Sequence, residues 1–402
     1  MTIRHKKISC LNLFCLLSFI LLFAGCTTFR SALPRPLNDA LRPASYAKII
    51  RVAIVLSKPS AVISVIGPGT FYDKINHRRI KRFSAIGKTT FSVKNNQIFI
   101  NTHNTKTSHI IILADMPQSI RLRDKFDEDI VYRGRMDIVA NGNNTLTVIN
   151  TLPIDEYIMG VVPRETFPAW PTAALRAQAV AARTFAVSHL PNGKNRKYDI
   201  VSPTHQLYGG ATAETPSTTK AVLDTQGEIL TYNGKILCAF FYTCCGGKTE
   251  EAENIFSTIK EYPHAVDSPY CKGTKHYSWN YSVALQNCSQ KLKKAGKYLP
   301  GQIKSVKIIE RFKSGRAAKI KFSSRVKSVV ITGEECRKIL GYNNIRSTLF
   351  KIRTKNDRLQ FVGRGWGHGV GLCQWCSEVM AVKGLDYEQI LKHFYPGAII
   401  ER

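Results

Sequence analysis

Acidic residues are scarce in this sequence: 28 Asp and Glu stand against 58 Lys and Arg, which gives a net charge of +30 over 402 residues. A charge of this size indicates a polyanionic neighbour: nucleic acid, anionic lipid or an anionic cell-wall polymer. The sequence has no zinc-finger spacing, no basic-region heptads and no aromatic strand of the RNP type. We therefore expect no nucleic-acid partner, and a nucleic-acid-binding surface protein is an alternative that only the charge supports.

Several catalytic motifs are also missing. There is no H-E-x-x-H, no G-x-S-x-G and no P-loop, which excludes zincins, serine hydrolases of the elbow type and P-loop NTPases. Glycine occupies every second position from Gly363 to Gly371, but the spacing does not match the dinucleotide-binding pattern G-x-G-x-x-G. We expect no cofactor.

Long apolar runs are confined to the N-terminus. Three basic residues precede the run Leu11–Ala24, which is short for a transmembrane helix and ends in small residues. This pattern predicts a signal peptide over residues 1–25. Cys26 follows Ala-Gly as in a bacterial lipobox, so we expect a lipidated, periplasmic protein of the cell envelope, anchored in the outer membrane, with residues 26–47 as a tether. Plain secretion is the alternative.

The middle of the chain has no cysteine, whereas eight stand in its second half: Cys238, Cys244, Cys245, Cys271, Cys288, Cys336, Cys373 and Cys376. An even number of cysteines outside the cytoplasm favours disulfides. We expect one disulfide within the group Cys244, Cys245 and Cys271, with a metal site as the alternative. Cys373 and Cys376 have the spacing of a redox or zinc pair, but a structural role is favoured.

The remaining pattern predicts an α+β protein. Short β-branched runs broken by Gly, Asn and Pro fill residues 48–129, which indicates a β-rich N-terminal region. Mixed helical and strand patterns follow over residues 130–402. Asn141-Gly142 is a strong hairpin signal between two apolar runs. Residues 172–189 predict a helix in which Leu175, Ala179, Ala182 and Ala186 form a stripe of small side chains for close packing.

Glu165 stands out in front of this helix. Pro163, Pro168 and Pro171 surround it, so we expect a loop between a strand-like run and the helix. Loops pinned to rigid elements often carry catalytic side chains, although Glu165 could equally be a solvated loop carboxylate. Arg183 on the helix could be solvated, could clamp a substrate or could pair with Glu165.

The alternating-glycine segment offers a second candidate. Glycines at every other position allow the backbone to approach a bulky ligand closely, and Trp366 between them could stack on a sugar ring. In this interpretation Trp366 and His368 face a groove. The alternative is a tightly packed turn in which the hydrogen bonds of His368 are satisfied.

Three ordered blocks of this sequence resemble the SpoIID/LytB family, which comprises stage II sporulation protein D and the amidase enhancers. The similarity extends from about Val131 to the C-terminus, roughly two-thirds of the chain. The blocks that carry it are Leu152–Tyr157 with Arg164-Glu165, Trp170-Pro171 and Ala177–Thr184; Gln206–Gly210 with Cys245–Glu250; and Gly363–Gly371 with Cys373-Gln374.

The resemblance implies a protein directed at peptidoglycan. Some members are lytic transglycosylases that cleave glycan strands already stripped of stem peptides, with the essential acid at the position of Glu165. Others are regarded as amidase enhancers without chemistry of their own. A SpoIID-like domain with a central groove is implied over residues 130–402. The residues expected to line that groove are Arg183, Gln206, Tyr208, Trp366, His368 and Gln374.

This sequence departs from the family pattern in two places. Some relatives carry a His/Cys metal cluster before the Gln-x-Tyr segment, but residues 198–205 contain only His205, so we expect no metal there. Tyr242 stands where many relatives have a histidine. We predict a lytic transglycosylase of denuded glycan strands, with a cell-wall amidase as a partner. The alternative is a non-catalytic activator of such an amidase, in division, sporulation or turnover.

Overall fold

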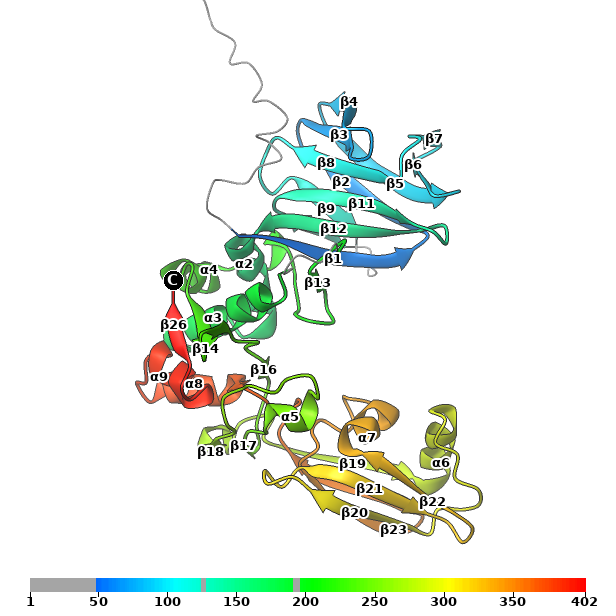
Figure 1. The fold of residues 1–402 in the computed structure, drawn as a ribbon, viewed down its shortest axis with the longest axis vertical. Helices are drawn as coiled ribbons and strands as arrows, with labels where there is room; N and C mark the ends of the chain where they lie inside the picture. The colour runs from blue at the N-terminus through cyan, green and yellow to red at the C-terminus, as the bar shows by residue number, and fades with distance from the viewer. Residues whose placement is uncertain (1–47, 124–127, 191–195) are drawn as a thin grey trace, which may run out of the picture. The chain divides into compact units, whose positions relative to one another are not determined.

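The structure, a computed structural model, describes residues 48–123, 128–190 and 196–402 (Figure 1). The predicted signal peptide, the lipidation site Cys26 and the tether lie outside these residues and stay predictions. Among the described residues, no helix combines the length and the apolar character needed to span a membrane.

Two antiparallel sheets contain the first strands of the chain. The seven-stranded sheet has the order β13-β1-β12-β11-β8-β3-β4, and the six-stranded sheet has the order β10-β9-β2-β5-β6-β7. The strands of the first are β1 (Ile49–Lys58), β3 (Gly69–Asp73), β4 (Arg78–Phe83), β8 (His109–Ala114), β11 (Arg135–Asn141), β12 (Thr145–Pro153) and the parallel β13 (Ile200–Val201). Those of the second are β2 (Ser60–Val65), β5 (Ile86–Lys94), β6 (Gln97–Ile100), β7 (His103–Asn104), β9 (Ile120–Arg123) and β10 (Asp129–Tyr132).

The hairpin predicted at Asn141-Gly142 is confirmed, because β11 and β12 pair in register from Arg135–Thr151 to Asn141–Thr145. β12 also pairs along its length with β1, the first described strand. The seven-stranded sheet therefore contains strands of the predicted N-terminal region, residues 48–129, and strands of the predicted region 130–402.

The segment before Glu165 is a helix, α2 (Ile154–Glu165), and the prediction of a strand-like run and a loop was wrong. Apolar residues recur at helical spacing in this segment, and their burial favours a helix more strongly than the prolines oppose one. The buried residues are Ile154, Tyr157, Ile158, Val161 and Val162. Pro163 lies in the last turn, and the carbonyl of Gly160 accepts a hydrogen bond from Gly209 N–H at 3.0 Å. Glu165 is thus the last residue of a packed helix.

The second predicted helix is confirmed as α3 (Thr172–Ser188). Its stripe of Leu175, Ala179, Ala182 and Ala186 is buried in a core shared with the two sheets and α2. The helix has a second buried face, which includes Ala177, Val180 and Ala181 and belongs to another core. Small side chains on two faces allow α3 to pack closely on both sides.

The second core is formed by side chains of α3, α8, α9 and several short strands. Figure 1 shows where these elements lie. Two elements that precede this core are η1 (Ala211–Ala213) and α4 (Pro216–Asp224), whose Ala221 and Val222 belong to the first core. The elements that follow are β14 (Ile229–Tyr232), β15 (Lys235–Ile236), β16 (Phe241–Tyr242), β17 (Gly247–Lys248), α5 (Ala252–Ile255), β18 (Asp267–Ser268), η2 (Pro269–Cys271), β25 (Leu372–Cys373), α8 (Gln374–Val382), α9 (Tyr387–Phe394) and β26 (Ile399–Glu401). β16 and β25 pair in parallel, with Tyr242 opposite Cys373.

A third core belongs to residues 278–364, where α6 and α7 accompany two three-stranded sheets. The elements are β19 (Ser278–Ala284), α6 (Leu285–Lys294), β20 (Ser305–Arg311), β21 (Ala317–Ser323), β22 (Ser328–Thr332), α7 (Gly333–Leu340), β23 (Phe350–Lys355) and β24 (Arg358–Arg364). Separate sheets and helices of this kind confirm the predicted α+β class.

Candidate functional site

Glu165 is held at the C-terminal end of α2 by the backbone of the Gln206–Gly210 segment. Its Oε1 atom accepts a hydrogen bond from Leu207 N–H at 2.7 Å, and the side chain is half-buried. The bond from Gly209 N–H to the Gly160 carbonyl ties the same segment to α2 one turn earlier. One carboxylate oxygen is therefore fixed by a rigid donor.

Burial raises the pKa of Glu165 above its ordinary value of 4.5. The hydrogen bond from Leu207, the Gln374 side chain and the charge of Arg164 oppose this rise, in that order. The loss of hydration outweighs them because an ionised carboxylate is costly in a poorly hydrated site. The carboxyl group consequently keeps its proton to higher pH than a solvated glutamate, which is the form that can donate it.

Gln374, the first residue of α8, faces Glu165. Its side chain is 5% exposed and its contact with the carboxylate lowers the pKa of Glu165. The contact falls short of a full hydrogen bond, so the buried Gln374 Nε2 atom has no hydrogen-bond partner among the residues that the structure describes. A buried amide donor without a partner is costly unless a ligand or water meets it.

A band of aromatic side chains continues from Glu165 across α8. Trp170 contacts both Phe167 and Trp375, each at 5.5 Å between ring centroids. His276 then lies 5.4 Å from Trp375 and 4.9 Å from Trp366. Phe167 is 52% exposed and the three tryptophans are half-buried, so this band presents ring faces and edges at the surface. Such surfaces pack well against the C–H faces of sugars.

Arg183 is a core residue and does not contact Glu165. Its side chain is 1% exposed, and its Nε atom donates to Asp155 Oδ1 at 2.6 Å. The two terminal nitrogens donate to the carbonyl oxygens of Glu228 and Val222. These bonds join α3 to α2 and α4, so Arg183 stabilises the scaffold behind the site rather than lining a groove.

Gln206 and Tyr208 are also interior. Gln206 accepts a hydrogen bond from Tyr157 Oη at 3.0 Å and donates to the Ala182 carbonyl, and Tyr208 donates to Asn150 Oδ1 at 2.8 Å. Both side chains are buried. They anchor the segment whose backbone amide holds Glu165, and their part in the site is to position that amide.

Comparison with known proteins places these features in a family. A family model described as "Stage II sporulation protein" matches residues 142–232, and one described as a domain of unknown function (DUF8618) matches residues 221–371. The chain is 32% identical over 354 residues to an uncharacterised protein of Brachyspira hyodysenteriae, covering 88% of this chain and 92% of the relative. It is 31% identical to stage II sporulation protein D of Bacillus subtilis, covering 63% of this chain and 75% of that protein. The chain belongs to the SpoIID family.

An amidase enhancer of Bacillus subtilis is also similar to this SpoIID-family protein. The identity is 26% over 289 residues, which is 60% of this chain and 40% of the enhancer. The comparisons therefore link the protein to stage II sporulation proteins and to an amidase enhancer.

In this SpoIID-family protein the alternating glycines contact the chain itself. A Cβ atom on Gly367 would lie 2.7 Å from Tyr242 Cβ, and one on Gly371 would lie 2.1 Å from the Phe240 carbonyl. Both residues have positive φ angles, +117° and +77°. The glycines thus allow residues 365–371 to pack on residues 240–246, and the expectation of close approach to a ligand is corrected.

His368 is held in this packed turn by both of its ring nitrogens. Nδ1 accepts from Val370 N–H at 3.1 Å, which leaves the proton on Nε2, 3.1 Å from the Phe241 carbonyl. Burial lowers the pKa of His368 to about 3, aided by the positive charges of Arg337 and Arg316. The imidazole is neutral at physiological pH and stabilises the turn through its two hydrogen bonds.

Trp366 has two sets of contacts. Its ring belongs to the aromatic band, but the Arg346 guanidinium lies over it at 4.6 Å from the ring centroid.

Of the aromatic band, sequence reasoning predicted only Trp366 as a site residue and missed Phe167, Trp170, Trp375 and His276. Trp375 could have been found, because it follows Gln374 directly and an aromatic residue beside a polar site residue is typical of carbohydrate contacts. His276 lies in a stretch of mixed composition that contains no motif to indicate a site residue.

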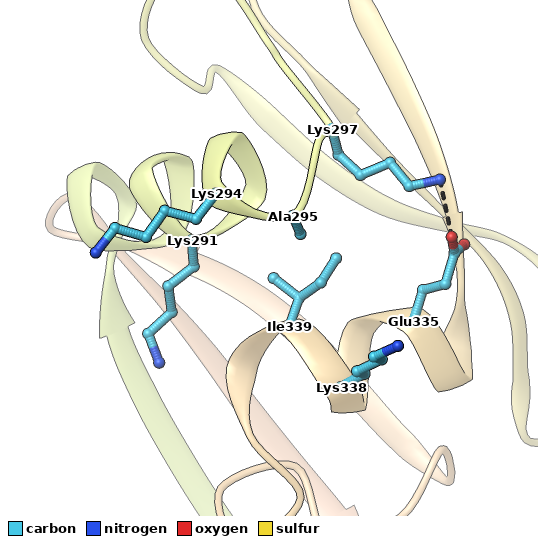
Figure 2. A pocket seen from close by; sticks show the side chains of 7 residues that line it. All are labelled: Lys291, Lys294, Ala295, Lys297, Glu335, Lys338 and Ile339. Atoms are coloured by element: carbon cyan, nitrogen blue, oxygen red, sulfur yellow. Dashed lines mark ion pairs between the residues drawn. The ribbon is translucent and has the colours of Figure 1, made fainter. Parts of the chain in front are cut away.

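A separate hollow lies between α6 and α7 (Figure 2). It has a volume of about 620 Å³ and is lined by Lys291, Lys294, Lys297 and Lys338, with Glu335 paired to Lys297 at 2.8 Å. Four lysines around one acid leave an excess of positive charge. The elements that form this hollow differ from those that form the Glu165 site.

The expected disulfides are absent among the described residues, where all eight cysteines are free thiols. Cys288 and Cys336 are buried in the third core, whereas four of the others converge at one place. That convergence was not visible from sequence, since the four come from three segments.

Proposed function

We propose that this protein is a lytic transglycosylase that cleaves peptidoglycan glycan strands free of stem peptides. The observation that supports the proposal is the Glu165 carboxyl group, whose pKa is raised by burial and which lies beside an aromatic band. Its environment favours the protonated form required of a general acid.

A single carboxyl group is sufficient for this reaction. Hydrolytic glycosidases place two carboxyl groups about 5–9.5 Å apart around the bond. The other acids of α2, Asp155 and Glu156, are nine or more residues from Glu165, which is about 13 Å along a helix. Within α2 no second carboxylate is in range, and a reaction that uses a hydroxyl of the substrate in place of water needs none.

In the proposed mechanism Glu165 acts first as acid and then as base. It donates its proton to the glycosidic oxygen as the bond from C1 of the muramyl sugar to that oxygen breaks. The carboxylate then takes the proton from the 6-hydroxyl of the same sugar while O6 bonds to C1, which yields the 1,6-anhydro product. The proton is returned to Glu165 and no water is consumed.

The neighbouring residues have defined parts in this mechanism. Leu207 N–H fixes Oε1, so the other carboxylate oxygen can carry the transferred proton. The unpartnered Gln374 Nε2 can donate to the carboxylate when it forms or to the sugar. The aromatic band supports the glycan chain, and the net charge of +30 favours approach to a wall that carries anionic polymers.

The alternative is a non-catalytic, glycan-binding activator of a cell-wall amidase, which the named amidase enhancer supports. Mass spectrometry of sacculi digests discriminates between the two. The full chain should produce anhydro-muramyl ends on amidase-treated sacculi but not on intact ones. Retained binding with no anhydro ends, together with faster stem-peptide release when an amidase is added, would replace the enzyme proposal with the activator.

The rate of glycan cleavage should depend on pH through Glu165. The acid form is required, so the rate falls as pH rises through the pKa of Glu165. Because burial raises that pKa, this falling limb of the pH–rate profile lies above pH 4.5. Gln374 lowers that pKa, so Gln374→Leu should move the limb to higher pH. Ser377→Ala, a buried change on the same helix, should leave it in place. Rates measured from pH 4 to 9 that show no shift, or a shift to lower pH, would contradict this assignment.

Trp375→Ala should weaken glycan binding about tenfold, as expected for the loss of a central aromatic contact. We would measure binding to denuded strands in the Glu165→Gln background, so that no substrate is consumed. Tyr298→Ala is the matched control, because Tyr298 is 56% exposed and belongs to the α6–β20 connection. Equal effects of the two substitutions would mean that the aromatic band is not the binding surface.

A further inference from the structure

Four cysteine side chains meet beneath the start of α8. The sulfur atoms of Cys245, Cys271, Cys373 and Cys376 all lie within 4.8 Å of one another, and all four residues are buried. They come from three separate segments: the turn after β16, the end of η2, and the junction of β25 with α8. The fold, rather than local sequence, brings the four together.

The distances between these sulfur atoms fit a common metal ion. Cys245 Sγ lies 3.4 Å from Cys271 Sγ and 3.5 Å from Cys376 Sγ. A disulfide bond would require about 2.05 Å. Four thiolates at about 2.3 Å from a tetrahedral zinc ion are about 3.8 Å apart. An iron–sulfur cluster distributes its four cysteines over two or four iron atoms and so spreads the sulfurs more widely.

Backbone N–H groups are directed at two of the four sulfur atoms. Cys373 Sγ accepts from the backbone N–H groups of Cys245 at 3.1 Å and Cys376 at 3.4 Å, and Cys245 Sγ accepts from Gly247 N–H at 3.3 Å. Hydrogen bonds of this kind orient metal ligands and offset their negative charge. Arg316, fully buried, donates to the Cys245 carbonyl at 2.8 Å, and two of its nitrogens have no partner.

The buried charges also compensate one another in part. Four thiolates and one Zn²⁺ carry a net charge of −2, and the Arg316 guanidinium directly behind Cys245 compensates part of it. In the absence of a metal, this arginine would be a buried cation whose side chain, within the described part of the chain, hydrogen-bonds only to the carbonyl oxygens of Cys245 and Lys248. A buried cation of this kind is costly.

We propose that Cys245, Cys271, Cys373 and Cys376 bind a structural zinc ion through their thiolates. Four cysteine ligands complete a tetrahedral shell with no open position, which is typical of structural rather than catalytic zinc. The site lies apart from residues 198–205, where we expect no metal. It replaces the expected disulfide among Cys244, Cys245 and Cys271.

The ion has a consequence for the Glu165 site, and this part rests on the proposed function. Cys373 and Cys376 bracket Gln374 and Trp375 in the first turn of α8. Binding both cysteines to one ion fixes this turn, and with it the amide that meets Glu165 and the central ring of the aromatic band. Metal binding itself does not depend on catalysis.

The test is the metal content of the full chain, purified without chelators and measured by inductively coupled plasma mass spectrometry. We expect about one zinc per chain, released when a mercurial reagent modifies the thiols. Cys271→Ser and Cys376→Ser should lose the zinc. Cys288→Ser, Cys336→Ser and Cys244→Ser, also buried cysteines, should retain it.

Three results would overturn the proposal. One is a wild-type chain without zinc that is two mass units lighter per disulfide than its reduced form. Another is stoichiometric iron with visible absorption. The third is loss of zinc in Cys244→Ser but not in Cys271→Ser and Cys376→Ser. Because the wild-type measurement decides the first two, a variant that fails to fold leaves the test intact. Zinc without anhydro-muramyl products would reject the proposed function but not the metal site.

Discussion

Glu165→Gln is expected to lower the rate of anhydro-muramyl end formation by about 10²- to 10⁴-fold, the usual contribution of a general acid and base. Glutamine has nearly the same shape as the protonated carboxyl group and can still accept the hydrogen bond from Leu207 N–H. It can neither donate the proton to the leaving oxygen nor recover it from the 6-hydroxyl. Rates would be measured on amidase-treated sacculi, with glycan binding as a second measurement that should change little.

Glu156→Gln provides a matched control. Glu156 lies on the same helix, is half-buried, and burial raises its pKa as well, but it is at the other end of α2. This variant should cleave at the wild-type rate. Equal loss of cleavage in both variants would indicate that glutamine substitution disturbs α2 itself, and full activity of Glu165→Gln would remove Glu165 from the chemistry.

Arg183→Met is expected to reduce the free energy of unfolding by about 3–5 kcal/mol, the cost of breaking a buried ion pair by removing one partner. Asp155 would lose its partner at 2.6 Å, and the carbonyl groups of Glu228 and Val222 would lose their donors inside the protein. The shift would appear in urea unfolding curves of the full chain. Any loss of glycan cleavage should then follow the fraction of unfolded protein.

Arg176→Met is the corresponding control. Arg176 is on the same helix and the same face, and it pairs with Asp224, but its side chain is 34% exposed. Exposed pairs contribute little, so its unfolding curve should stay close to that of the wild type. If Arg183→Met were as stable as the wild type and yet inactive, the residue would act on the substrate directly, contrary to its position in the core.

Local signals in the sequence were sufficient for several elements. The Asn141-Gly142 turn predicted the β11–β12 hairpin because these two residues suit the backbone angles of a tight turn wherever it occurs. The small-residue stripe of α3 predicted a closely packed helix for a similar reason. Glu165, the family motifs and the excess of positive charge were equally visible. The turn, the stripe and the acid each depend on about a dozen residues of chain, and the charge is a sum over the whole sequence, so none of these signals requires a tertiary contact.

Other predictions failed where distant segments decide the outcome. The glycines of residues 365–371 were interpreted as making room for a ligand, but the segment they make room for is residues 240–246. Arg183 could have been a substrate clamp, and its partners lie 28 to 45 positions away. A sequence indicates that a residue needs close approach or a countercharge, but it does not identify what supplies it.

The sequence by itself determined the fold class, the α3 helix and the β11–β12 hairpin, and it singled out Glu165 as the candidate acid of the proposed function. Only the tertiary structure decided that Glu165 ends a helix, that Gln374 stands against it, and that four cysteines meet. These cysteines are Cys245, Cys271, Cys373 and Cys376. The physical reason is the separation along the chain over which each effect acts. Turn geometry and helix period act between neighbouring residues, whereas burial, pKa and metal-ligand geometry depend on atoms that more than a hundred residues of chain can separate.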